Sequence, residues 1–127
     1  MTVSYMKKIV AWVNKNMQKR ILKEFSDSDT TIVFIRSFSN FKEEITDTSL
    51  NIISPSNFND LDSSNFIIDV SNFFKANPNK IFRIFMYLGE KASPLSCGFL
   101  SREKNVTCHI ISRDYKGTIQ ARIDANL

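Results

Sequence analysis

Cysteine, glycine, proline and histidine are all scarce in this chain. Its 127 residues include two Cys, three Gly, three Pro and one His. Two cysteines exclude a disulfide-rich scaffold, and so few glycines argue against Gly-rich phosphate loops and repeat folds. No apolar run approaches the roughly 20 residues of a membrane span, and the short run Ile9–Val13 lacks the length of a signal-peptide core. These absences predict a cytoplasmic protein without a transmembrane segment.

Hydrophobic side chains, in contrast, are plentiful. They make up 43% of the residues and include eleven Phe, while 24% of the residues are charged. A chain of this length has the usual size of one domain and enough apolar material for a core. We therefore predict a single compact domain over residues 1–127.

Apolar spacing predicts alternating helices and strands in the first two thirds of the chain. Val3 to Phe25 has an apolar stripe at helical spacing. Further helices are expected from a cap at Asn40 and, beyond a polar loop at 55–65, over 66–74 with caps at 62–64. Strands are expected at 31–38, 50–53 and 81–88, the first and last of them apolar on both faces. This alternation favours parallel strands joined by helical crossovers.

The last third predicts a different arrangement. Short β-rich segments at 97–101, 106–113 and 118–123 are separated by linkers of hairpin size. Apolar and polar residues alternate over 118–123, as on an edge strand with one wet face. The expected fold is therefore α/β (α+β), with a mixed sheet whose parallel half is followed by an antiparallel meander of about three strands.

The net positive charge of the chain comes from the first predicted helix alone. Residues 1–25 contain six cations and one acid, whereas the other 102 residues contain eleven cations and twelve acids. On one helix, four lysines would lie opposite the apolar stripe with two aromatic residues among them. The candidate partner-binding residues are Tyr5, Lys8, Trp12, Lys15, Lys19 and Lys23. Such a surface suits an acidic protein or a nucleic-acid backbone with stacked bases, and a membrane surface less well; a solvated helix face is the simpler interpretation.

The thiols and the histidine do not predict a catalytic or metal site. In the expected hairpin, Cys97 and Cys108 share a face but lie diagonally, about 7–8 Å apart, which is beyond disulfide reach. His109 faces the other way, so we expect core cysteines and a surface histidine. A nucleophile at Cys97 in the turn 96–98 is a poor alternative. No catalytic residue, cofactor or metal is predicted.

Aromatic residues follow two of the predicted strands. Phe38, Phe41 and Phe58 would lie where open α/β sheets bind ligands, and Arg36 and Lys42 could line such a crevice. Aromatic plugs at the sheet edge are the stronger interpretation. A phosphoacceptor domain is disfavoured, because Arg36-Ser37-Phe38 brings no acid to the end of its strand.

Three function classes remain from these observations. The first is a small protein that binds one specific protein partner, as an adaptor, inhibitor or immunity-type protein that neutralises a cognate effector; an exposed edge strand would also allow strand addition. The second is nucleic-acid binding through the basic helix. The third is an enzyme of unfamiliar type, for which the sequence nominates no site. We expect the first class, in a bacterial or phage-like setting suggested by the Ile-, Asn- and Lys-rich composition.

Overall fold

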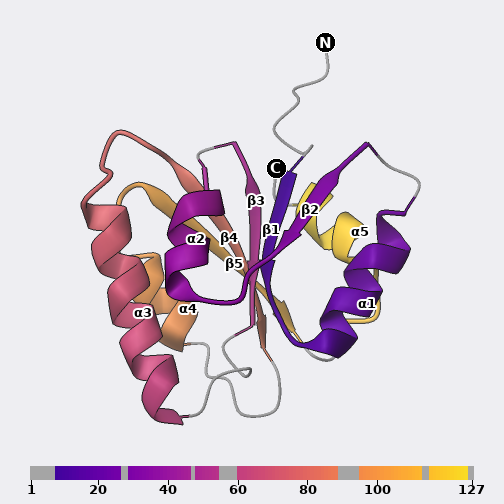
Figure 1. Cartoon of the computed structure of the whole chain (residues 1–127), viewed down its shortest axis with the longest axis horizontal. Helices are drawn as coiled ribbons and strands as arrows, with labels where there is room; N and C mark the ends of the chain where they lie inside the picture. Colours follow the sequence, from indigo (N-terminus) through magenta and orange to yellow (C-terminus); the bar gives the residue numbers. More distant parts are fainter. Residues whose placement is uncertain are drawn as a thin grey trace.

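Helices and strands alternate along the whole described chain (Figure 1). The structure is a computed structural model that describes residues 8–26, 29–46, 48–54, 60–88, 95–112 and 115–125. Its strands are β1 (Lys8–Trp12), β2 (Thr31–Phe34), β3 (Leu50–Ile53), β4 (Phe82–Leu88) and β5 (Val106–Ser112). Its helices are α1 (Lys15–Glu24), α2 (Phe38–Glu44), α3 (Asp60–Lys75), α4 (Leu95–Leu100) and α5 (Ile119–Asp124).

The five described strands form one parallel sheet. Their order is β2-β1-β3-β4-β5, and all four pairings are parallel. This is the strand order of the flavodoxin-like doubly wound α/β fold. The α/β class is confirmed, whereas the predicted mixed sheet with an antiparallel meander is wrong.

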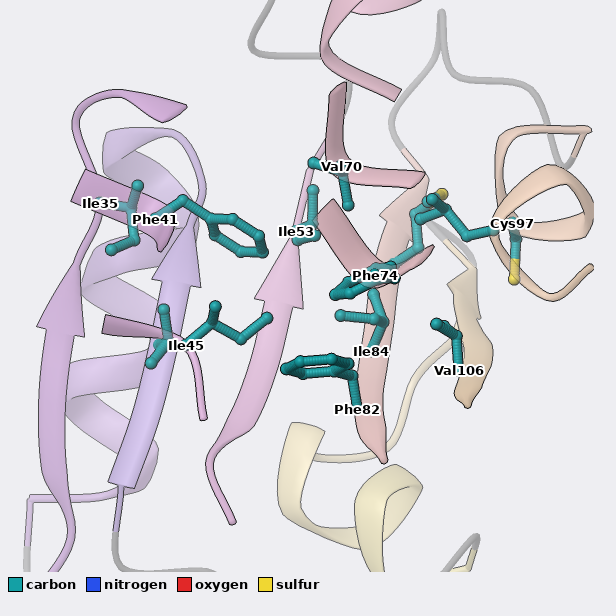
Figure 2. Packing of buried hydrophobic residues seen from close by; sticks show 13 residues of the cluster. Ile35, Phe41, Ile45, Ile53, Val70, Phe74, Phe82, Ile84, Cys97 and Val106 are labelled. Atoms are coloured by element: carbon teal, nitrogen blue, oxygen red, sulfur yellow. The ribbon is translucent and has the colours of Figure 1, made fainter. Parts of the chain in front are cut away.

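Helices cover both faces of the sheet (Figure 1). On one face α2, α3 and α4 bury a cluster that includes Val10, Phe41 and Phe74, drawn in part in Figure 2. On the other face α1 and α5 bury a cluster that includes Ile9 and Ile21. Because side chains alternate along a strand, β1 contributes to both clusters and is buried on both sides.

The helix predicted over Val3 to Phe25 is wrong over residues 8–14, and its first residues, 3–7, lie outside the described residues. Residues 8–12 form the inner strand β1, and only 15–24 are helical. The run Ile9–Val13 is apolar at every position, which suits a strand covered on both faces as well as a helix stripe. Asn14 then starts the helix, since its Oδ1 accepts a hydrogen bond from the Met17 N–H at 2.8 Å.

In the last third, the strand predicted over 106–113 is confirmed as β5, but the other two predicted strands are helical. Residues 97–101 fall largely in α4, and residues 119–123 fall in α5, which Thr118 caps by accepting from the Ala121 N–H at 3.0 Å. Ile119 and Ile123 are both buried, so their spacing of four marks one helix face. The edge strand predicted there is absent, and the described edges are β2 and β5.

Several boundaries differ from the prediction by a few residues. Ser37, and not Asn40, caps α2, because its Oγ accepts from the Asn40 N–H at 3.1 Å. β2 therefore ends at Phe34 instead of continuing to 38. The helix α3 begins at Asp60, so the predicted caps at 62–64 and the end of the predicted polar loop lie within it. Residues 55–59 of that loop lie outside the described residues.

The length and hydrophobicity of the described helices bear on whether one of them could span a membrane. Among the helices that the structure describes, none is both long and apolar enough to cross a bilayer.

Candidate functional site

The six candidate partner-binding residues do not share one helix face. Lys8 and Trp12 belong to β1, and both side chains lie on the α2 side of the sheet. Lys8 Nζ is 3.1 Å from Glu44 Oε2 of α2, and the ring centroids of Trp12 and Phe41 are 5.7 Å apart. Trp12 is half-buried against the core cluster. Tyr5 lies outside the described residues.

Three of the six remain together on α1. Lys15, Lys19 and Lys23 are all exposed, and their spacing of four residues places them along one side of the helix, about 6 Å apart in rise. We call these three residues the lysine ridge. None of them forms an ion pair with another residue in the described ranges. The sheet separates the ridge from Lys8 and Trp12, because α1 covers the face opposite to α2.

An exposed leucine lies beside the ridge. Leu22, between Lys19 and Lys23 in sequence, is 49% exposed to solvent. It does not belong to the buried side of α1, which is formed by Met17 and Ile21. A single exposed apolar side chain is normal on a protein surface, so Leu22 does not mark a contact surface by itself.

A cationic groove continues the surface at the carboxyl end of α1. It has a volume of about 420 Å³ and is lined by residues of α1 and of the loop before α5: Arg20, Lys23, Glu24, Lys116, Gly117 and Thr118. Arg20 is fixed there, with Nε 3.1 Å from Glu24 Oε2 and Nη2 donating to the Gly117 carbonyl at 2.9 Å. Lys116 is exposed and brings a further charge beside Lys23.

Lys116 was missed by sequence reasoning. It lies 93 positions from Lys23, and only the packing of α5 beside α1 brings its loop to this groove. No local pattern predicts that placement, because the segment after it was expected to be a strand.

The carboxyl edge of the sheet is the usual ligand site of a doubly wound fold. Ligands bind where neighbouring strands send their connections to opposite faces, which here is between β1 and β3. Near this edge a cavity of about 220 Å³ is lined by Asn14, Asn16, Met17, Arg20 and Tyr87. It is smaller than the roughly 300–1,000 Å³ of most small-molecule pockets.

Carboxylates are missing from the described strand ends. The residues that directly follow β1, β2 and β3 are Val13–Asn14, Ile35–Arg36 and Ser54. Within the described ranges, no group of three or more His, Cys, Asp or Glu side chains could hold a metal ion. The described part of this edge therefore offers hydrogen-bonding groups and Arg20, and no acidic cluster.

Aromatic residues after β2 pack inward. Phe41 is fully buried, and Phe38 stacks on it with ring centroids 6.5 Å apart. Lys42 Nζ lies 4.9 Å from the Phe38 ring centroid, whereas Arg36 is exposed. The interpretation of Phe38 and Phe41 as plugs at the sheet edge agrees with this packing; Phe58 lies outside the described residues.

The two cysteines meet, contrary to the predicted diagonal separation. Cys97 on α4 and Cys108 on β5 belong to one packed cluster, and each side chain shifts the pKa of the other. The expected distance of 7–8 Å assumed a hairpin, but α4 packs on β5 instead and brings the thiols together. His109 faces the other side of β5, as predicted, and its ring lies 5.3 Å from Phe85. Burial, and then the charge of Arg122, lowers the pKa of His109 below 6.5.

Comparison with known proteins adds no relative. No protein-family model, curated protein or solved structure matches this chain.

Proposed function

We propose that this chain is a non-catalytic, cytoplasmic protein that binds one acidic protein partner through the lysine ridge of α1, as an adaptor, inhibitor or immunity-type protein. The observation that carries the proposal is the row of Lys15, Lys19 and Lys23 on one exposed helix side, without ion pairs among the described residues. Carboxylates on a partner would neutralise this row and speed association.

Leu22 would add apolar area to such a contact. By helical spacing its exposed side chain lies beside the ridge, so a partner that covers the lysines could also remove apolar area from water. Lys116 at the neighbouring groove extends the same charge toward α5. The expected footprint is therefore the outer side of α1 and the loop before α5.

Charge reversal on matched surfaces tests the proposal. Tagged wild-type protein, Lys19→Glu/Lys23→Glu and the control Lys80→Glu/Lys104→Glu are used to capture proteins from the native host after nuclease treatment. The two double variants change net charge equally, and all four lysines are exposed. We expect wild type and control to capture a specific partner equally, and the ridge variant to capture at least tenfold less of it.

Two outcomes would overturn this proposal. Equal capture by the ridge variant would show that the partner binds elsewhere on the molecule. Capture that disappears on nuclease treatment would instead favour nucleic-acid binding through the same lysines.

Nucleic acid remains the second candidate because the ridge alone can contact phosphates. The stacking residue expected for it, Trp12, packs against Phe41 on the other side of the sheet. Binding by lysines without stacking depends on counterion release and weakens steeply with salt. Affinity for a single-stranded oligonucleotide that falls steeply as the salt concentration rises to about 200 mM, and that falls further with Lys15→Glu, would favour this class over the protein partner.

A further inference from the structure

Two thiols that are distant in the predicted hairpin are neighbours in the folded chain. Cys97 lies in α4, and Cys108 lies in β5 on the sheet face that α4 covers. In Figure 2 the Cys97 side chain extends from α4 at the edge of the core cluster, near the strand that carries Val106. Cys97 is 6% exposed, and Cys108 is partly buried.

Contact between the thiols makes them chemically unequal. The Cys108 side chain lowers the pKa of Cys97 to about 7, against the raising effect of burial. Ser101, whose Oγ donates to the Cys97 carbonyl at 2.9 Å, acts in the same direction. The same contact, together with burial, raises the pKa of Cys108. At neutral pH Cys97 is therefore the nucleophile of the pair, because the thiolate is the reactive form.

We propose that Cys97 and Cys108 are a modification site at which a small hydroperoxide forms an intramolecular disulfide joining α4 to β5. The site lies on the sheet face opposite the lysine ridge and does not depend on the proposed partner. The slight exposure of Cys97 selects a small oxidant over a bulky disulfide such as oxidised glutathione.

The chemistry proceeds in two balanced steps. The Cys97 thiolate attacks one peroxide oxygen and breaks the O–O bond, which gives a Cys97 sulfenic acid and a hydroxide or alkoxide that takes up a proton. The Cys108 sulfur, losing its proton, then attacks the Cys97 sulfur and expels hydroxide, which leaves as water. In total two thiols are oxidised and one peroxide is reduced to water, or to water and an alcohol.

Intact-mass spectrometry after treatment with hydrogen peroxide tests the site. The native wild-type protein is expected to lose the mass of two hydrogen atoms, to react with no thiol reagent afterwards, and to regain both thiols with dithiothreitol. Native protein should form the disulfide at least tenfold faster than protein unfolded in urea, because only the fold holds the sulfurs in contact. Cys108→Ala is expected to stop at a sulfenic acid that dimedone traps on Cys97.

A pH titration supplies an independent measurement. The rate of Cys97 alkylation by iodoacetamide should reach half its maximum near pH 7 in the wild type and at a clearly higher pH in Cys108→Ala, which lacks the second thiol. Circular dichroism confirms that the variant is folded. Independent oxidation of each thiol to a sulfinic acid, disulfides only between molecules, or equal rates in native and unfolded protein would each overturn the proposal.

Discussion

Asn105 shows how one polar side chain joins distant parts of the chain. Its Nδ2 lies 3.1 Å from the Phe74 carbonyl and 3.0 Å from the carbonyls of both Asn77 and Lys80. These acceptors belong to the end of α3 and the loop before β4, whereas Asn105 directly precedes β5. The amide therefore fixes the loop at the amino edge of the sheet.

Replacing Asn105 tests this role at the residue scale. Asn105→Ala should lower the free energy of unfolding by about 1–3 kcal/mol because carbonyl groups lose their donor. Asn105→Asp should lower it further, since its carboxylate would face three carbonyl oxygens. Urea unfolding measures both effects, and the control Asn79→Asp, an exposed residue of the same loop, should stay within about 0.5 kcal/mol of wild type. Equal stability of Asn105→Asp and Asn105→Ala would contradict this account.

At the scale of elements, α1 holds the short helix α5 in place through one carboxylate. Glu24 Oε1 accepts the Ile119 N–H at 2.7 Å, and more weakly the Gln120 N–H at 3.4 Å. Its other oxygen pairs with Arg20. A six-residue helix gains little from its own hydrogen bonds, so this contact, the Thr118 cap and two buried isoleucines stabilise it.

Glu24→Ala should therefore loosen α5 selectively. Loss of hydrogen bonds to a charged acceptor is expected to lower the free energy of unfolding by about 1.5–3 kcal/mol. Relative to wild type, the exchange of amide hydrogens should accelerate more in residues 119–124 than in β3. Hydrogen exchange read by NMR, together with urea unfolding, measures both. Glu43→Ala removes an exposed acid of α2 as the control; a similar effect from both variants would rule out a specific role for Glu24.

The α5 segment also shows why part of the fold could not be predicted from the sequence. Ile119, Ala121 and Ile123 alternate like a strand, yet Ile119 and Ile123 are also four residues apart, and the choice depends on the Thr118 cap. The inner strands β3 and β4 were predictable because their short apolar runs are bounded by polar segments. The run Ile9–Val13 was ambiguous because no polar segment separates it from the apolar residues that follow. Met17 and Ile21 continue its helical spacing beyond Asn14.

The candidate site was predictable only in part, for the same physical reason. Lys15, Lys19 and Lys23 stay aligned because the second half of the predicted helix is confirmed. Lys8 and Trp12 leave that face because β1 alternates with a period of two. The contact of Cys97 with Cys108 depends on α4 packing on β5, which no local pattern contains.

For the whole molecule, the sheet is shared by two helical layers that contact different faces. The rings of Phe74 and Phe82 pack with centroids 4.6 Å apart in the α2–α4 layer, and Ile21 is fully buried in the α1–α5 layer. Because every described strand pairs with a neighbour through the same sheet, damage to either layer should destabilise both.

Phe74→Ala and Ile21→Ala test this coupling. We expect losses of about 3–5 and 2–5 kcal/mol, respectively, from the cavities they leave. Trp12 fluorescence, which reports the α2 side, and far-UV circular dichroism should give one coincident urea transition in each variant. Leu22→Ala, at an exposed position, is the control with a change within about 0.5 kcal/mol. A fluorescence transition in Ile21→Ala that lags behind the dichroism would show that the layers unfold separately.

The place of β1 has a consequence for how the chain reaches this structure. Both strands that flank β1, β2 and β3, come later in the sequence, and a helical segment precedes each of these strands. No described strand can therefore pair with its neighbour through a quick local turn, and each pairing must wait for a crossover to close, which slows the search for the native state. During synthesis Ile9, Val10 and Ala11 would stay without their final partners until residue 53 has emerged, so this segment is where chaperone binding or aggregation of the nascent chain should begin.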